Sequence, residues 1–299
     1  MNAPSFNCTS KRILSSVWER RRRILYLLNV LAPVMGAGLW WSGRPLGAVV
    51  TLGAAHAAWL GSTLWPNAPW SGAVAGRQGF HAAANTGRSE RRLWLTIDDG
   101  PSPTDHDALL RLLDQAKVKV SVFVIGRRAS SDPQLVKEWH EAGHRIENHT
   151  WSHAAASTWI IGPQRARDEV DRCQDHLSDL VGRVPRWFRA PAGLANPWLH
   201  DAVERRGLTT LAWTARGFDG GLARDPDAVV RRIRARWRPG GIVLMHQGTM
   251  ASNGRALAPQ VLERLLEAAA ADGLIWAEPD AAERALKQQR RPVGRLMVR

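Results

Sequence analysis

Cysteine, lysine and tyrosine are all scarce in this chain of 299 residues. The two cysteines, Cys8 and Cys173, lie far apart in the sequence and indicate neither a disulfide framework nor a cysteine metal site. Because lysine is rare, the formal net charge of +14 comes mostly from arginine. A charge of this size usually suggests nucleic acid or an anionic surface as a partner.

The motifs that accompany nucleic-acid binding are absent as well. The chain has no zinc-finger spacing, no basic–aromatic RNA motif and no helix-turn-helix signature. We therefore predict no nucleic-acid partner and interpret the charge as a compositional preference for arginine. Attraction to anionic lipid is the second interpretation.

Charged residues are missing from two long runs near the N-terminus. Ile24 to Trp41 has 18 uncharged residues, and as a helix this run would span roughly 27 Å. Leu46 to Trp65 is a weaker second run of 20 residues, interrupted by His56. We predict a membrane helical hairpin over 24–66. A cleavable signal peptide and a buried hairpin packed on a soluble domain are the alternatives.

Basic residues beside these runs predict an orientation. The segment 1–23 is polar and ends in the cluster Glu19-Arg20-Arg21-Arg22-Arg23, which by the positive-inside rule places the N-terminus in the cytoplasm. Two crossings return the chain to the cytoplasm. We expect attachment to the bacterial inner membrane with the remaining chain in the cytoplasm. If only the first run crosses, that part faces the periplasm.

Strand and helix patterns alternate after a predicted linker at 67–90. Helical patterns separate seven β-prone runs, which cover 93–97, 120–125, 145–148, 186–189, 208–213, 241–246 and 274–277. This alternation indicates an α/β domain with a mainly parallel sheet, and seven strands fit a closed or nearly closed barrel. We assign 91–280 to this domain and 281–299 to a basic C-terminal tail.

The stretch Leu93 to Pro101, LWLTIDDGP, combines an apolar strand with two adjacent carboxylates, Asp98 and Asp99. Paired acids at the end of a buried strand each need a cation, a metal or hydrogen-bond donors. Neighbouring side chains of a strand point to opposite sides, so one acid would hold a metal and the other would handle protons. The alternative is an Asp-Gly-Pro turn whose acids cap the next helix.

Two histidines at metal-ligand spacing favour the first interpretation. His149 and His153 stand at i and i+4 in HTWSH and would face the same side of one helical turn. Together with Asp99 they offer two nitrogens and one oxygen, which leaves coordination positions open for water and substrate. The residues Asp98, Asp99, His149, Arg189 and His246 all fall at or just after a predicted strand end, where barrel enzymes carry their chemistry.

Four motifs in order resemble those of the polysaccharide deacetylases of the NodB-homology type, carbohydrate esterase family 4. They are TIDDGP, HTWSH, Arg189-Ala190-Pro191 and Leu244-Met245-His246. The resemblance covers about residues 91–280. It implies a metal-dependent N- or O-deacetylase on a distorted (β/α)7-type barrel.

The resemblance also implies roles for individual residues. Asp99, His149 and His153 would hold a divalent metal ion, with zinc expected first and cobalt or nickel as alternatives. Asp98 would be the general base, and Arg189 would pair with it to keep it ionised and oriented.

Four further residues take their roles from the same resemblance. His246 would be the general acid that protonates the departing amine, and Asp219 would tune it. The backbone N–H of Ala192 would help to hold the oxyanion, and Leu244 would line the acetyl pocket. At Ala192 the family usually has an aromatic residue.

The segment Trp213 to Gly220 departs from the family pattern. Arg216 stands where an aspartate is common, and Gly220 stands where a tryptophan would pack. The expected effect is a pocket wall that is more open and more basic. Arg216 would meet a phosphate or carboxylate on the substrate, or it would be a solvated side chain.

These observations predict a membrane-associated, metal-dependent carbohydrate deacetylase. Its expected substrate is an acetylated glycan or a lipid-linked amino sugar. The alternative is a catalytically inactive module that binds carbohydrate or lipid. Such modules tend to lose a metal ligand or the base, whereas this chain has all the expected metal ligands and the expected base.

Overall fold

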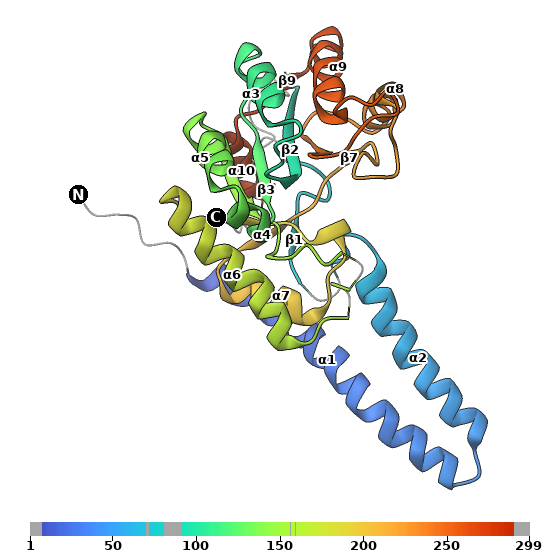
Figure 1. Ribbon diagram of the computed structural model, residues 1–299. Coiled ribbons are helices and arrows are strands. Elements are labelled where there is room, and N and C mark those ends of the chain that lie inside the picture. The colour runs from blue at the N-terminus through green and yellow to red at the C-terminus, as the bar shows by residue number, and fades with distance from the viewer. Residues whose placement is uncertain (1–7, 70–71, 81–90, 156, 159, 290–299) are drawn as a thin grey trace, which may run out of the picture.

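The computed structural model describes residues 8–69, 72–80, 91–155, 157–158 and 160–289, and Figure 1 shows their arrangement. The strands are β1 (Val74–Ala75), β2 (Arg92–Gly100), β3 (Ser121–Val124), β4 (Arg145–Asn148), β5 (Trp187–Phe188), β6 (Thr209–Leu211), β7 (Ala215–Arg216), β8 (Gly241–His246) and β9 (Ile275–Trp276). The helices are α1 (Cys8–Trp41), α2 (Pro45–Leu64), α3 (His106–Gln115), α4 (Gly126–Ser131), α5 (Pro133–Glu141), α6 (Pro163–Val181), α7 (Pro197–Arg205), α8 (Pro226–Arg234), α9 (Leu257–Ala271) and α10 (Pro279–Gln289), with the 3₁₀ turn η1 (Pro191–Gly193).

The strands form one parallel sheet in the order β1-β6-β5-β4-β3-β2-β8-β7, and β9 pairs with the start of β2. Within the described residues β1 pairs only with β6, and β7 pairs only with β8. The sheet is therefore a half-barrel. The predicted α/β class and distorted barrel of parallel strands are confirmed in this form, and each of the seven predicted strand regions contains a strand.

Apolar side chains cover both faces of strand β2. Leu93, Leu95 and Ile97 pack into a cluster with apolar side chains of α3 and α9. Trp94 points to the other face, into a second cluster with Phe123 of β3. Burying each such side chain contributes about 1.5–3 kcal/mol. Since alternate residues share a face, this register sends Thr96 and Asp98 to the same side as Trp94.

Both ends of the predicted deacetylase domain extend further than expected. Val74 and Ala75, inside the predicted linker, pair with β6, and Phe80 packs edge-on against Trp94 with ring centroids 6.2 Å apart. Ala282 and Leu286 of α10, inside the predicted tail, are buried in the same cluster. These pieces are too short to show a clear hydrophobic period, and only their tertiary contacts place them.

Helices α1 and α2 lie side by side and project from the α/β domain (Figure 1). Helix α1 begins at Cys8, so residues 8–23 continue the helix that the sequence placed only after residue 23. Arginine favours helix, which is why the basic cluster does not interrupt it. Among the described residues, Glu19–Trp41 is the single helical stretch long and apolar enough to cross a membrane. The membrane hairpin itself stays a prediction.

Both helices of this pair contact α7 of the α/β domain. Arg22 of α1 donates to the Glu204 carboxylate at 2.7 Å. Tyr26 stacks on Trp198 with ring centroids 6.0 Å apart, and Trp59 of α2 contacts the same ring at 5.1 Å. Aromatic contacts of this kind fix the position of the helices relative to the domain.

Candidate active site

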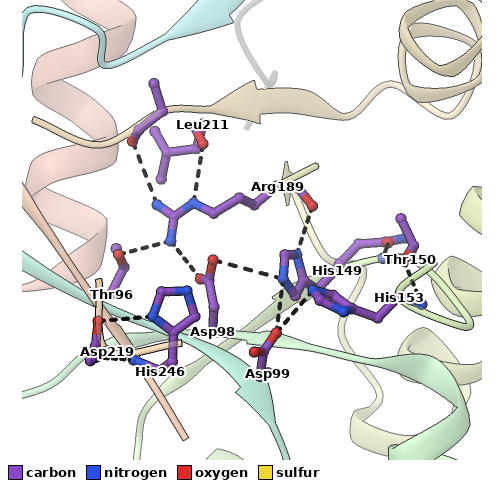
Figure 2. A network of polar contacts seen from close by, with 12 residues as sticks. Thr96, Asp98, Asp99, His149, Thr150, His153, Arg189, Leu211, Asp219 and His246 are labelled. Carbon is purple, nitrogen blue, oxygen red and sulfur yellow. Dashed lines mark hydrogen bonds and ion pairs between the residues drawn. The ribbon is translucent and has the colours of Figure 1, made fainter. Parts of the chain in front are cut away.

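The two carboxylates near the end of β2 have different main partners (Figure 2). Asp98 lies on the inner face of the sheet, where Arg189 Nη1 donates to its Oδ1 at 2.6 Å. Asp99 faces His149 and His153, and His149 Nε2 also lies 3.8 Å from Asp98 Oδ2. The pairing of β2 with β8 sets Asp98 directly opposite His246. The two acids therefore point apart, and this occurs where β2 is irregular and Asp99 has a left-handed backbone (φ 66°).

Arg189 follows β5 and is fully buried. Its Nη1 also donates to Thr96 Oγ1 at 2.9 Å, and its Nε donates to the Leu211 carbonyl at 3.2 Å. The guanidinium lies 4.1 Å from the ring centre of Phe123. A buried guanidinium needs this many acceptors, and its rigid planar shape lets it orient the Asp98 carboxylate.

His246 ends β8 and is held by Asp219 through two contacts. Its backbone N–H donates to Asp219 Oδ2 at 2.8 Å, and its Nδ1 lies 3.0 Å from Asp219 Oδ1. A carboxylate only accepts, so Nδ1 carries a proton. Burial lowers the pKa of His246, but the charge and hydrogen bond of Asp219 outweigh burial and raise the pKa to about 9. His246 is therefore a proton donor at neutral pH.

Replacing Asp219 by asparagine is expected to shift the alkaline limb of kcat/KM to lower pH. The raised pKa keeps His246 protonated through neutral pH, and its proton is lost as the pH rises through that value. Without the carboxylate the proton is lost roughly 1–3 pH units earlier. The measurement is kcat/KM against pH. Asp227→Asn on the exposed face of α8 is the control, and an alkaline limb unmoved in Asp219→Asn would contradict this role.

The predicted metal ligands come together at one point. Asp99 Oδ1 lies 3.3 Å from His149 Nε2 and 3.1 Å from His153 Nε2, and the three ligand atoms are all within 4.8 Å of one another. The helical turn predicted for HTWSH is wrong, because these residues form a non-helical loop after β4. Left-handed backbone at Thr150 (φ 67°) and His153 (φ 53°) folds the second imidazole back toward the first.

The chemistry of these donors fits a divalent cation. His149 Nδ1 lies 2.7 Å from the Arg189 carbonyl oxygen, so Nδ1 carries the proton and Nε2 presents a lone pair. Burial and the neighbouring His149 lower the pKa of His153 to about 4, so that imidazole is neutral. Asp99 Oδ1 is buried without a hydrogen bond. Three converging lone pairs repel one another, and a cation relieves the repulsion.

The two remaining predicted residues line the same end of the sheet. Ala192 lies in η1, directly after Arg189-Ala190-Pro191, with a left-handed backbone (φ 54°). The next residue, Gly193, accepts a hydrogen bond at 2.8 Å from the N–H of Asn67. Leu244 is buried in β8, two residues before His246. The loop of Ala192 is thus attached to the segment that follows α2.

Comparison with known proteins agrees with this arrangement. The family model "Polysaccharide deacetylase" matches residues 85–211. A chitooligosaccharide deacetylase from Bradyrhizobium is 32% identical over 162 residues, which are 53% of this chain and 71% of that protein. The chain belongs to the polysaccharide deacetylase family. A peptidoglycan-N-acetylglucosamine deacetylase from Bacillus cereus is 29% identical over 179 residues, which are 60% of this deacetylase and 81% of the Bacillus protein.

Solved structures carry the same fold. A family 4 carbohydrate esterase from Streptomyces lividans matches with a TM-score of 0.55 and 28% identity, over 62% of this chain and 92% of that one. The peptidoglycan deacetylase PdaC from Bacillus subtilis matches with a TM-score of 0.57 and 21% identity, over 67% and 93%. The NodB-homology, carbohydrate esterase family 4 assignment made from the motifs is confirmed.

Sequence reasoning missed Asp105 in this polysaccharide deacetylase. Asp105 stands just before α3, where an aspartate usually caps the helix, but its side chain makes no cap hydrogen bond. It accepts instead from the backbone N–H of Gly248 at 2.7 Å and from Gln247 Nε2 at 3.2 Å. This buried carboxylate thereby positions the loop that follows His246. No local signal distinguishes such a contact from an ordinary helix cap.

Proposed function

We propose that this polysaccharide deacetylase removes N-acetyl groups from an amino-sugar glycan or a lipid-linked amino sugar with the help of a divalent cation. One observation carries the proposal. Asp98 and His246 lie opposite each other at the ends of neighbouring strands, and the group of Asp99, His149 and His153 lies beside them. Hydrolysis of an acetamide needs a base, an acid and charge stabilisation, and this arrangement supplies all three.

Each residue has a defined step. Asp98, oriented by the hydrogen bond from Arg189, accepts the proton of the attacking water. The backbone N–H of Ala192 donates to the oxygen of the acetyl carbonyl as negative charge develops on it. His246 gives its Nε2 proton to the departing amine, and Asp219 stabilises the protonated imidazole.

Asp99, His149 and His153 would hold the cation. When bound by these three residues, a divalent ion would supply Lewis-acid polarisation of the acetyl carbonyl and would lower the pKa of a nearby water. Zinc is the first candidate because two imidazole nitrogens and one carboxylate are ligands that it accepts with positions left open. Cobalt and nickel accept the same set.

The test is acetate release from an N-acetylglucosamine oligomer and from a polyprenyl-linked N-acetylglucosamine. We expect release by the zinc-loaded protein, loss of it after chelation, and recovery when zinc is restored. His140→Ala, which removes a histidine away from this site, should keep the response to zinc. No release from any substrate by protein that contains zinc would favour the alternative, a module that binds carbohydrate without catalysis.

We also propose that the helix pair sits in the cytoplasmic membrane with the catalytic domain in the cytoplasm. Tyr26 near the middle of α1 and Trp59 in the C-terminal half of α2 contact the same residue, Trp198. If only α1 crossed the bilayer, α2 would lie on the other side of it and Trp59 could not contact the same ring as Tyr26. These contacts therefore favour a crossing by both helices. The cluster at 20–23 then lies on the same side as the domain, which the positive-inside rule assigns to the cytoplasm.

The exposed apolar surface of α1 and α2 supports the same proposal. Many large apolar side chains there are exposed, among them Ile24, Leu27, Val30, Val34, Met35, Trp40, Leu46, Val49 and Val50. Alkaline phosphatase fused after Arg299 should be inactive, and a green fluorescent protein fusion should be fluorescent. An active phosphatase fusion would instead place the domain outside.

A further inference from the structure

Arg216 lies beside the catalytic residues through the pairing of β7 with β8. It stands opposite Leu244, two residues before His246. The loop that follows β7 carries Asp219, which holds His246. Arg216 therefore belongs to the wall of the site that is next to the proposed acid.

Two aromatic rings hold the Arg216 guanidinium. Its Cζ lies 5.4 Å from the ring centre of Trp213 and 4.4 Å from that of Phe218. The Trp213 ring also lies 5.7 Å from the guanidinium of Arg189, which binds the proposed base. Contacts with ring faces fix the plane of a guanidinium and leave the N–H donors at its edge available for another partner.

Among the described residues, no carboxylate is within 4.0 Å of this guanidinium. Other arginines of the domain do have such partners, for example Arg234 with Asp272 and Arg264 with Asp227. Arg216 is half-buried, and burial lowers its pKa. A cation that has lost part of its hydration and has no counter-ion gains from binding an anion.

Gly220 packs against the His246 ring on the same side of the site. A Cβ atom at this position would lie 3.0 Å from Cδ2 of the His246 ring, closer than ordinary packing permits. The φ angle of Gly220 lies outside the left-handed region, so its backbone conformation does not demand glycine. Its small size therefore matters, because it lets the His246 ring pack closely against the loop that carries Asp219.

We propose that Arg216 selects an amino-sugar substrate that carries an anionic group, a phosphate or a carboxylate, close to the acetamide. The planar guanidinium donates paired hydrogen bonds to either anion. This inference rests on the proposed function and adds its substrate class. Three sources offer such an anion: a free sugar phosphate, a lipid-linked sugar phosphate and a uronic acid in a glycan.

The test is calorimetric binding to the zinc-loaded protein of deacetylated sugars, which are not consumed. Glucosamine 1-phosphate should bind about tenfold more tightly than methyl glucosaminide, as expected for a charge-assisted hydrogen bond. Arg216→Gln should remove most of this preference. Arg231→Gln, an exposed arginine of α8, should keep it. A glucosaminyl-uronate disaccharide and a polyprenyl-diphosphate glucosamine in detergent identify the source of the anion.

Equal affinity of the native protein for all these sugars would overturn the inference, and so would a preference that survives in Arg216→Gln. Phe218→Leu removes one of the two aromatic rings that contact the Arg216 guanidinium. Because the Phe218 side chain is 41% exposed, this change should weaken the preference without affecting folding. It replaces Arg216→Gln if that variant does not fold. Binding is read without acetate release, so failure of this inference is distinguishable from failure of the proposed catalysis.

Discussion

Asp98→Asn is expected to lower kcat about a thousandfold while the protein keeps its divalent cation. Asparagine has the same shape and still accepts the hydrogen bond of Arg189, but it cannot take a proton from water. General bases contribute roughly 10²–10⁴-fold to the rate. The metal content should be unchanged because Asp98 is not among the three converging ligands. The measurements are the rate of acetate release and the zinc content of the purified variant.

Asp201→Asn is the matched control. Asp201 is an aspartate of α7 that pairs with Arg205 at the surface, so its loss should leave kcat within about twofold of native, as exposed ion pairs are worth little. A kcat for Asp98→Asn within tenfold of native would place the base elsewhere. Loss of zinc from this variant would show that Asp98 has a structural role in the metal site.

Arg189→Met is expected to lower the free energy of unfolding by about 3–5 kcal/mol. Methionine fills a similar volume, but it leaves the buried Asp98 carboxylate without its cation and Thr96 without a donor. Removing one partner of a buried ion pair costs more than the pair itself contributes, because the remaining charge stays away from water. Unfolding in urea, followed by circular dichroism, measures the change.

Two further variants separate charge from packing in this prediction. Arg205→Met removes an exposed arginine and should change the free energy of unfolding by less than about 1 kcal/mol. Arg189→Met combined with Asp98→Asn should be more stable than the sum of the two single changes predicts, because no uncompensated charge remains. Additive effects would show that Arg189 acts through packing and not through Asp98.

The sequence predicted the donors of the site because they follow strands. A short apolar run that ends in Asp98 and Asp99 must bring these carboxylates to one edge of a parallel sheet, and the same holds for His246 at the end of β8. The polarity of each strand therefore placed these residues at one end without knowledge of the strand order. The two acids point apart as alternation along a strand predicted, but the left-handed backbone of Asp99 (φ 66°) at an irregularity of β2 contributes to this.

Local patterns failed where the backbone departs from regular structure. The spacing of His149 and His153 indicated a helical turn, whereas the loop brings them together through left-handed residues. Helical spacing and a folded loop both place i and i+4 close together, so the distance was predicted for the wrong reason. Asp105 was missed because its partners, Gln247 and Gly248, are more than 140 residues away in the sequence.

By itself, then, the sequence determined which groups this deacetylase brings to the site and at which end of the sheet they lie, because strand direction and side-chain alternation are local properties. Only the tertiary structure decided which of them touch. The register of β2 against β8 sets Asp98 opposite His246, and Arg189 reaches Asp98 from a third strand. Such contacts depend on strand order and on long-range packing, which no short stretch of residues encodes.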